Sequence, residues 1–240
     1  MKNIFKNNLR AGALSGLMIW GGIFVLVFGA IFLLAAFGGK GNTDGEGAVL
    51  IDAVSANDRT QGVAGALVTL VEYGDFQCPA CASYHAFVKK LIEEEGDKVF
   101  FAYRHFPLRT IHKNADEAAW AAEAAGIQGK FWEMSDMIYK NQKDWEKSDT
   151  AGKIFEDYAK QLGLNVEQFI VDRDSDVVKS KVEADLQSGL RAKVTGTPTF
   201  FVNGKKITNP SSYDEFKKLV LGSSAATSLV PNVPEEIPSL

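Results

Sequence analysis

The only two cysteines of the 240-residue chain, Cys78 and Cys81, stand in the stretch Cys78-Pro79-Ala80-Cys81. Two thiols at this spacing can close a disulfide and open it again by thiol–disulfide exchange. The apolar run before them, residues 67–73, predicts a buried strand, and Pro79 suits the first position of a helix. A strand that leads into a helix through Cys-x-x-Cys is typical of a thioredoxin-type redox site.

The position of Cys78 at a helix start predicts an acidic thiol. Unpaired backbone N–H groups and the positive end of the helix dipole stabilise a thiolate there. A thiol with a pKa of about 8.5 is only about 3% ionised at pH 7, whereas one with a pKa of about 5.5 is almost wholly thiolate. Cys81, one turn further on, is expected to be buried and to act as the resolving thiol. No cofactor is expected beyond the Cys78–Cys81 disulfide itself.

Metal binding is the other chemistry open to these cysteines. Cys78, Cys81, His85 and His105 could supply four zinc ligands. A second Cys-x-x-Cys pair is missing from the sequence, and a proline between the cysteines is more typical of redox sites, so we expect no metal. His85 lies two helical turns from Cys78, about 10 Å along the axis, which is too far to tune its sulfur. His105 and His112 are expected to serve structure at strand ends and on the surface.

The pattern of apolar residues and turn signals predicts the elements around the dithiol. In chain order they are a strand at residues 67–73, a helix at 79–95, a strand at 99–106, helices between 114 and 192, strands at 199–202 and 205–208, and a helix at 212–221. The Asn203-Gly204 pair predicts a two-residue hairpin turn. This order predicts an α/β, thioredoxin-like fold with an all-helical insertion at about residues 110–192.

The N-terminal part of the chain predicts a membrane anchor. Residues 11–39 carry no charge and are rich in Leu, Ile, Val, Phe and Gly. At about 1.5 Å per residue, a helix of this length exceeds a hydrocarbon core of roughly 30 Å, and it is about twice as long as the apolar region of a signal peptide. Because Lys2, Lys6 and Arg10 precede the span, residues 1–10 are expected in the cytoplasm and the rest outside the cell membrane. We therefore predict an uncleaved, single-pass anchor in the lipid bilayer.

The remaining segments complete the predicted organisation. Residues 40–62 are predicted to be a linker, residues 63–222 the thioredoxin-like domain, and residues 223–240, with three prolines, a disordered tail. The formal net charge of −4 and the lack of a basic stripe after the N-terminus predict no nucleic-acid partner. Disulfides persist outside the cytoplasmic membrane, where a lone dithiol can exchange with proteins that carry free thiols.

Three motifs in this order resemble the DsbA-like branch of the thioredoxin superfamily, the extracytoplasmic thiol:disulfide oxidoreductases. They are Glu72-Tyr73-Gly74-Asp75-Phe76-Gln77-Cys78-Pro79-Ala80-Cys81, Tyr103-Arg104-His105-Phe106-Pro107-Leu108 and Thr195-Gly196-Thr197-Pro198-Thr199-Phe200. The resemblance covers residues 63–221 and implies a bacterial protein that transfers the Cys78–Cys81 disulfide to secreted or membrane protein substrates. It also implies reoxidation by a membrane partner, a quinone-linked DsbB- or VKOR-like protein.

The resemblance implies roles for single residues as well. Cys78 exchanges disulfides with the substrate, and Cys81 resolves the mixed disulfide. Thr197 offers its backbone to an extended substrate segment beside Pro198, whose peptide bond is expected to be cis. Glu72 matches a buried acidic residue behind the dithiol that assists proton transfer. The alternative for Glu72 is an exposed charge at a strand end.

The residues between the cysteines, Pro79 and Ala80, are expected to contact the substrate. Strong oxidants of this family often carry a histidine where this chain has Ala80. One cationic group that would stabilise the Cys78 thiolate is therefore absent, and we expect a less oxidising couple than in the most extreme members, with Cys78 still acidic.

Two alternatives to disulfide donation remain open. The chain could be a disulfide reductase or isomerase, kept reduced by another dithiol carrier. It could also belong to a different class, that of membrane-tethered metallochaperones or assembly factors that use the dithiol as metal ligands.

Overall fold

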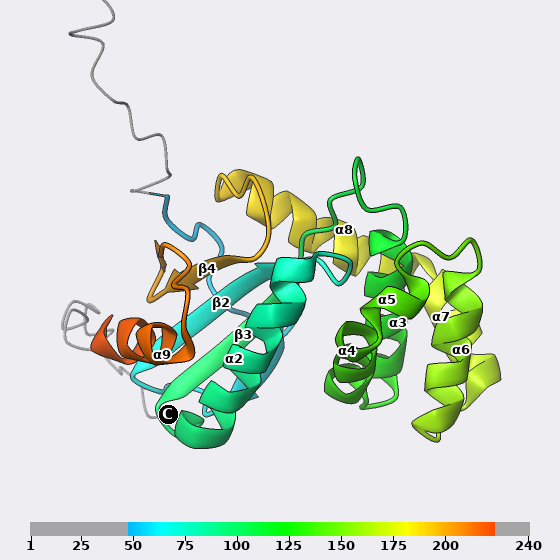
Figure 1. Ribbon diagram of the computed structural model, residues 1–240, viewed down its shortest axis with the longest axis horizontal. Coiled ribbons are helices and arrows are strands. Elements are labelled where there is room, and N and C mark those ends of the chain that lie inside the picture. Colours follow the sequence, from blue (N-terminus) through cyan, green and yellow to red (C-terminus); the bar gives the residue numbers. More distant parts are fainter. Residues whose placement is uncertain (1–47, 224–240) are drawn as a thin grey trace, which may run out of the picture. The chain divides into compact units, whose positions relative to one another are not determined.

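The computed structural model describes residues 48–223, which form one mixed sheet with helices around it (Figure 1). The predicted membrane anchor, residues 11–39, lies outside the described residues, and so do residues 1–10 and nearly all of the predicted tail. Between residues 48 and 223, every helix is too short or too polar to cross a bilayer.

The described part of the chain contains a five-stranded sheet with the strand order β1-β3-β2-β4-β5. The strands are β1 (Arg59–Gly62), β2 (Val68–Gly74), β3 (Val99–His105), β4 (Thr199–Val202) and β5 (Lys205–Lys206). β2 and β3 are parallel, whereas β1 runs antiparallel to β3, and β4 runs antiparallel to β2 and β5. A parallel pair needs a long crossover, which α2 (Pro79–Glu95) provides. This arrangement confirms the predicted α/β, thioredoxin-like topology.

Helix α2 has the bounds that its sequence predicts. Pro79 occupies its first turn, where the missing N–H costs no hydrogen bond. Cys81, Val88 and Leu91 share the buried face of the helix. The helix contacts β3 and α9 (Tyr213–Gly222). This packing holds the N-terminal end of α2 at the carboxyl end of β2, where the Cys-x-x-Cys stretch begins.

Between β3 and β4, where every residue is described, the chain forms six helices, in agreement with the predicted insertion. They are α3 (Ala115–Ile127), α4 (Phe131–Lys140), α5 (Gln142–Trp145), α6 (Ala151–Gln161), α7 (Val166–Asp174) and α8 (Asp176–Arg191). The buried alanines of α3 let α4, α6, α7 and α8 pack closely against it. Side chains of Asn165 and Ser175 cap α7 and α8. Figure 1 shows α3 to α7 beside the sheet and α8 leading back to it.

The hairpin of β4 and β5 turns at Asn203 and Gly204, whose φ angles of 48° and 79° are both positive. This two-residue turn requires a positive φ twice, which Asn and Gly adopt readily. β5 ends at Lys206, two residues earlier than the sequence predicts. Tyr73 near the end of β2 is paired with Thr199 at the start of β4, so the segment that precedes β4 lies close to the cysteines.

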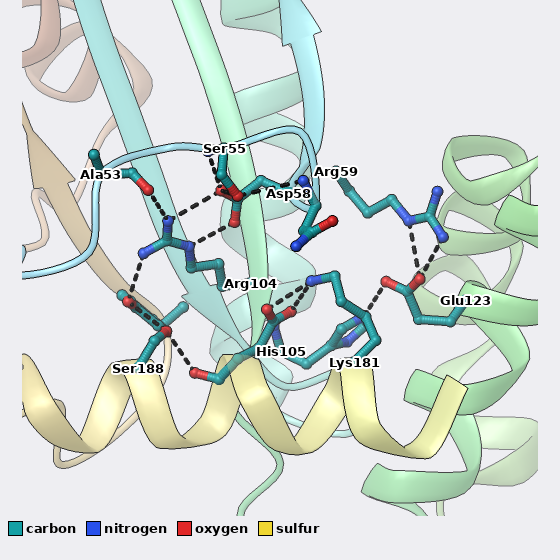
Figure 2. A network of polar contacts seen from close by, with 12 residues as sticks. Ala53, Ser55, Asp58, Arg59, Arg104, His105, Glu123, Lys181 and Ser188 are labelled. Carbon is teal, nitrogen blue, oxygen red and sulfur yellow. Dashed lines mark hydrogen bonds and ion pairs between the residues drawn. The ribbon is translucent and has the colours of Figure 1, made fainter. Parts of the chain in front are cut away.

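Residues 40–62, predicted to be a linker, end in a strand instead. Arg59–Gly62 forms β1 at the edge of the sheet. The residues before it are held by Arg104, a buried side chain of β3 that binds both carboxylate oxygens of Asp58 (Figure 2). Its other hydrogen bonds go to the carbonyls of Asp52 and Ala53 and to the hydroxyl of Tyr73. The end of the predicted linker is therefore part of the folded domain.

Glu123 of α3 joins the helical insertion to two strands. Its buried carboxylate accepts hydrogen bonds from Nε2 of His105 on β3 at 2.9 Å and from Nε of Arg59 on β1 at 3.0 Å (Figure 2). Burial disfavours the charged form, but the hydrogen bonds from His105 and Arg59 outweigh it and lower the pKa of Glu123 to about 2.

Replacing Glu123 by glutamine is expected to make the fold less sensitive to acid. A folded-state pKa below the unfolded value of 4.5 contributes stability that is complete above the unfolded pKa and is lost as the pH falls through the folded one. The contribution is about 3 kcal/mol at pH 7, of which about 2 kcal/mol is lost by pH 3. In urea unfolding, the free-energy difference between wild type and Glu123→Gln should shrink by about 2 kcal/mol from pH 7 to pH 3. A constant difference would contradict this assignment.

Candidate active site

The two thiols lie where β2 ends and α2 begins. Cys78 is the residue before α2, with extended backbone angles of φ −73° and ψ 122°, and Cys81 lies in the first turn. Both are free thiols; Cys78 is 7% exposed and Cys81 is fully buried. The carbonyl of Asp75 accepts a hydrogen bond from the Cys78 N–H at 3.1 Å, and the Asp75 N–H donates to Cys81 Sγ at 3.5 Å. The turn that enters the helix thus contacts both cysteines.

The surroundings of Cys78 favour its thiolate. A hydrogen bond from the Cys81 thiol, together with weaker ones from the Thr197 side chain and from the N–H groups of Cys81 and Ala80, outweighs burial and lowers the pKa of Cys78 to about 5. The backbone contribution is the one that the helix start predicts. The hydrogen bond from the Cys81 thiol lowers the pKa of Cys78 more, and the sequence did not predict it. Ala80 contributes only its backbone N–H to Cys78, because an alanine side chain has no polar group.

Cys81 has the opposite character. Burial, followed by its hydrogen bond to Cys78 and the charge of Glu72, raises the pKa of Cys81 well above the ordinary value. Cys81 therefore stays protonated at neutral pH and donates to the Cys78 thiolate. The two thiols are chemically unequal: Cys78 is acidic and keeps 7% exposure, whereas Cys81 is a fully buried proton donor.

Glu72 is buried in the middle strand of the sheet, and is 3% exposed. In the register of β2 it lies between Tyr103 of β3 and Phe200 of β4. Burial, assisted by the charge of Cys78, raises the pKa of Glu72 to about 8. Its carboxyl group is therefore largely protonated at pH 7. The alternative of an exposed charge at a strand end is wrong, because the side chain is covered.

Thr197, which precedes Pro198, lies against Cys78. The Thr197–Pro198 peptide bond is cis, as predicted, and the Thr197 carbonyl lies 3.3 Å from Cys78 Sγ, from which it accepts a hydrogen bond when the thiol is protonated. The Thr197 hydroxyl is buried and makes no hydrogen bond within residues 48–223, which leaves it free to donate to the Cys78 sulfur when that sulfur is a thiolate. Pro79 and Ala80 are exposed beside this site. A substrate chain can therefore approach Cys78 from this side.

Replacing Thr197 by valine is expected to raise the pKa of Cys78, because valine keeps the shape of threonine without the hydroxyl. Hydrogen bonds to charged groups contribute about 1.5–3 kcal/mol, so a rise of about one pKa unit is expected. Titration of the ultraviolet absorbance of the thiolate measures it. Thr199→Val is the matched control, since Thr199 donates to the Gly196 carbonyl and not to sulfur. Equal pKa values in wild type and Thr197→Val would contradict this role of the hydroxyl.

The helical insertion also contributes residues that the sequence did not reveal. Nε2 of Gln142, a buried side chain on α5, donates to the carbonyls of Phe76 at 2.7 Å and Cys78 at 3.1 Å. Gln77 in turn accepts from the backbone N–H of Asn114 and donates to the Glu146 carbonyl, both at 2.8 Å. These contacts fix the redox turn against the insertion. Gln142 lies more than sixty residues from its partners, so no local signal marks it.

The histidines all bind carboxylates. Nε2 of His85 is 2.7 Å from Asp136, and His105 binds Glu123 as described above. His112 was expected on the surface but is mostly buried, and its Nδ1 lies 2.7 Å from the carboxylate of Asp75. The zinc set proposed from the sequence is not assembled, and residues 48–223 contain no group of three His, Cys, Asp or Glu side chains placed to hold a metal.

Known proteins similar to this chain fall into two groups. Among curated proteins, the Na(+)/H(+) antiporter NhaA 1 of Salinispora arenicola is 36% identical over 177 residues, which cover 72% of this chain and 26% of that protein. The NhaA 1 antiporter of Mycolicibacterium gilvum is 40% identical over 157 residues, 64% of this chain and 24% of that protein. The chain thus spans about a quarter of the length of the curated relatives it matches.

Among solved structures, oxidised BdbD from Bacillus subtilis has a TM-score of 0.65 and 26% identity, over 74% of this chain and 98% of that one. Wolbachia pipientis α-DsbA1 has a TM-score of 0.63 at 18% identity, over 72% of this chain and 95% of that one, and shows the same fold. A family model described as thioredoxin matches residues 55–221. The chain therefore belongs to the thioredoxin family and has the fold of its DsbA-like members.

Proposed function

We propose that the chain is a protein thiol:disulfide oxidoreductase that donates the Cys78–Cys81 disulfide to secreted or membrane proteins. The observation that carries the proposal is the unequal pair of thiols, in which the pKa of Cys78 is lowered to about 5 and that of Cys81 is raised. Stabilising a thiolate stabilises the reduced protein and so makes its disulfide a better oxidant. The likeness to BdbD and the DsbA-like proteins supports this activity. This chain matches only about a quarter of each antiporter, so antiport activity is not proposed for it.

In the proposed reaction, a substrate thiolate attacks Sγ of Cys78 in the disulfide. The Cys78–Cys81 bond breaks as the mixed disulfide forms, and Cys81 leaves as a thiolate. Glu72, whose pKa is raised to about 8, gives its proton to Cys81 and regains one from solvent. A second substrate thiolate then attacks the substrate sulfur of the mixed disulfide and releases the Cys78 thiolate. Two electrons pass to the protein, and the substrate leaves with a new disulfide.

Substrate binding is proposed at the surface formed by Thr197, Pro198, Pro79 and Ala80. The Thr197 carbonyl lies 3.3 Å from the Cys78 sulfur, so an extended segment that pairs with the Thr197 backbone would have its cysteine close to Cys78. Pro79 and Ala80 present little side-chain chemistry and are exposed. The site is therefore expected to recognise the backbone and the cysteine sulfur of a substrate more than its other side chains.

The cellular setting is also part of the proposal. We infer that residues 11–39 hold the protein in the cell membrane, with residues 1–10 in the cytoplasm and the dithiol outside. The uncharged stretch and the basic residues before it support this topology. Each donated disulfide leaves the protein reduced, so a membrane partner must take up two electrons; a quinone-linked DsbB- or VKOR-like protein fits this need.

The direction of transfer is tested with the purified, oxidised full-length protein and a reduced, unfolded model substrate. We expect one substrate disulfide to form for each protein disulfide consumed, while insulin reduction in a glutathione buffer stays slow. Fast insulin reduction without substrate oxidation would contradict donation and favour a reductase. Stoichiometric zinc or copper in the purified protein would instead favour the metal-handling alternative.

A further inference from the structure

Asp75 is a fully buried carboxylate that the proposed reaction does not use. Its side chain has 0% exposure. One carboxylate oxygen accepts from the Gln77 N–H at 2.7 Å, and the other accepts from the Leu108 N–H at 2.8 Å and lies 2.7 Å from His112 Nδ1. A buried charge is tolerated only when hydrogen bonds compensate it, and these three partners do so.

The backbone of the same residue contacts both redox cysteines. The Asp75 carbonyl accepts from the Cys78 N–H at 3.1 Å, and the Asp75 N–H donates to Cys81 Sγ at 3.5 Å. The bond from the Gln77 N–H to the Asp75 side chain also curls the turn that delivers Cys78 to the start of α2. The place of Asp75 therefore decides how the two sulfurs lie relative to each other.

The second attachment of Asp75 is the loop that follows β3. Leu108 and His112 both come from this loop, more than thirty residues from Asp75 along the chain. The carboxylate thus fastens the redox turn to a separate part of the fold. Without it, the turn at residues 75–78 would keep its contacts with Gln142 and, through Gln77, with Asn114 and Glu146, but it would lose its side-chain attachment to this loop.

We propose that Asp75 is a positioning residue of the dithiol, whose carboxylate locks the redox turn to the loop at Leu108–His112 and so keeps the Cys81 thiol and the N–H groups of α2 directed at Cys78. The inference deepens the proposed function, since it states how that site holds its reactive geometry. Asp75 would influence the two sulfurs through its own backbone and through the loop at Leu108–His112, and it would not contact the substrate.

The charge and the position of Asp75 have opposite expected effects on Cys78, which makes the proposal testable. A nearby negative charge disfavours a thiolate, so removing the charge alone would lower the pKa of Cys78. Losing the positioned hydrogen bonds would raise it. Asp75→Asn removes the charge and keeps the shape, whereas Asp75→Glu keeps the charge and displaces the carboxylate. Positioning predicts a higher pKa in both variants.

The experiment titrates Cys78 in the reduced full-length variants and equilibrates them with glutathione. We expect the Cys78 titration to move up by about one pH unit, with about a tenfold shift of the glutathione equilibrium toward the disulfide form. Asp174→Asn is the matched control, because Asp174 binds Arg173 on α7 and is bonded neither to the redox turn nor to the loop at Leu108–His112; it should titrate like wild type.

A lowered or unchanged Cys78 titration in Asp75→Asn and Asp75→Glu would overturn the proposal. Should both variants fail to fold, Leu108→Pro removes one N–H donor to Asp75 and leaves the charges intact, and Leu108→Ala, which keeps the N–H, controls for the loss of the leucine side chain from the core. Equal titrations of Leu108→Pro and Leu108→Ala would overturn the proposal equally. Neither readout requires a substrate. Failure of the wild type to oxidise substrate would therefore count against the proposed function alone.

Discussion

Replacing Cys78 by serine is expected to abolish disulfide transfer, whereas replacing Cys81 by alanine should trap partners. Serine cannot form a disulfide, so the first variant has no mixed disulfide to enter. The second variant retains Cys78, whose thiolate forms a mixed disulfide by attacking a partner's disulfide and releasing the partner's other sulfur as a thiolate, and no Cys81 thiol remains to resolve the adduct. Non-reducing electrophoresis of cells that carry Cys81→Ala should show high-mass species that thiol reductants release, and Cys78→Ser should show none.

The identity of the trapped partners separates the remaining functions. Capture of many secreted or membrane proteins supports disulfide donation, and capture of a single assembly factor indicates a dedicated reductase. Cys81→Ala also removes the largest contribution to the low pKa of Cys78, so its trapping is best measured at a pH above the ordinary thiol pKa as well as at neutral pH. An absence of adducts at both pH values, with unchanged thiols in secreted proteins, would argue against both functions.

Replacing Asp58 by alanine is expected to lower the free energy of unfolding by about 3–5 kcal/mol, because it leaves a buried guanidinium without its counter-charge. Arg104 and Asp58 form a buried ion pair with N···O distances of 2.6 and 3.0 Å (Figure 2). The same guanidinium anchors the chain before β1 through two carbonyls. Urea unfolding at pH 7 measures the loss.

Two further variants give this prediction its control. The double variant Asp58→Leu with Arg104→Met removes both charges, and it should cost less than the sum of the single replacements, since buried pairs replaced by apolar groups are often near neutral. Asp149→Ala removes an exposed partner of Lys113 and should leave unfolding unchanged. Similar losses for Asp58→Ala and Asp149→Ala would show that the buried pair does not hold the segment before β1.

The parts of the fold that the sequence predicted are those with local signals. Helix α2 has Pro79 at its start and an apolar stripe, and the hairpin has Asn203-Gly204 at its turn. Strand β1 has neither. It consists of four residues with one glycine and three polar side chains, and its pairing with β3 depends on contacts such as those of Arg104 and Glu123. A tertiary contact of this kind cannot be read from a short polar segment.

The candidate site divides in the same way. Cys78 and Cys81 are marked by their own spacing, and Thr197 and Pro198 by their resemblance to a known motif. Gln142 and His112 reach the redox turn only through the folded insertion and loop. The burial of Glu72 also depends on strands from distant parts of the chain, so the sequence left two alternatives for it that the structure distinguishes.

The pH dependence of Cys78 alkylation in the reduced full-length protein tests the central claim most directly. Only the thiolate reacts, and buried Cys81 stays protonated and unreactive, so the rate follows the ionisation of Cys78. A folded protein with an activated thiol should reach half of its maximal rate near pH 5, in line with the lowered pKa of Cys78. A midpoint near the ordinary thiol pKa of about 8.5 would contradict the claim that this site stabilises a reactive thiolate.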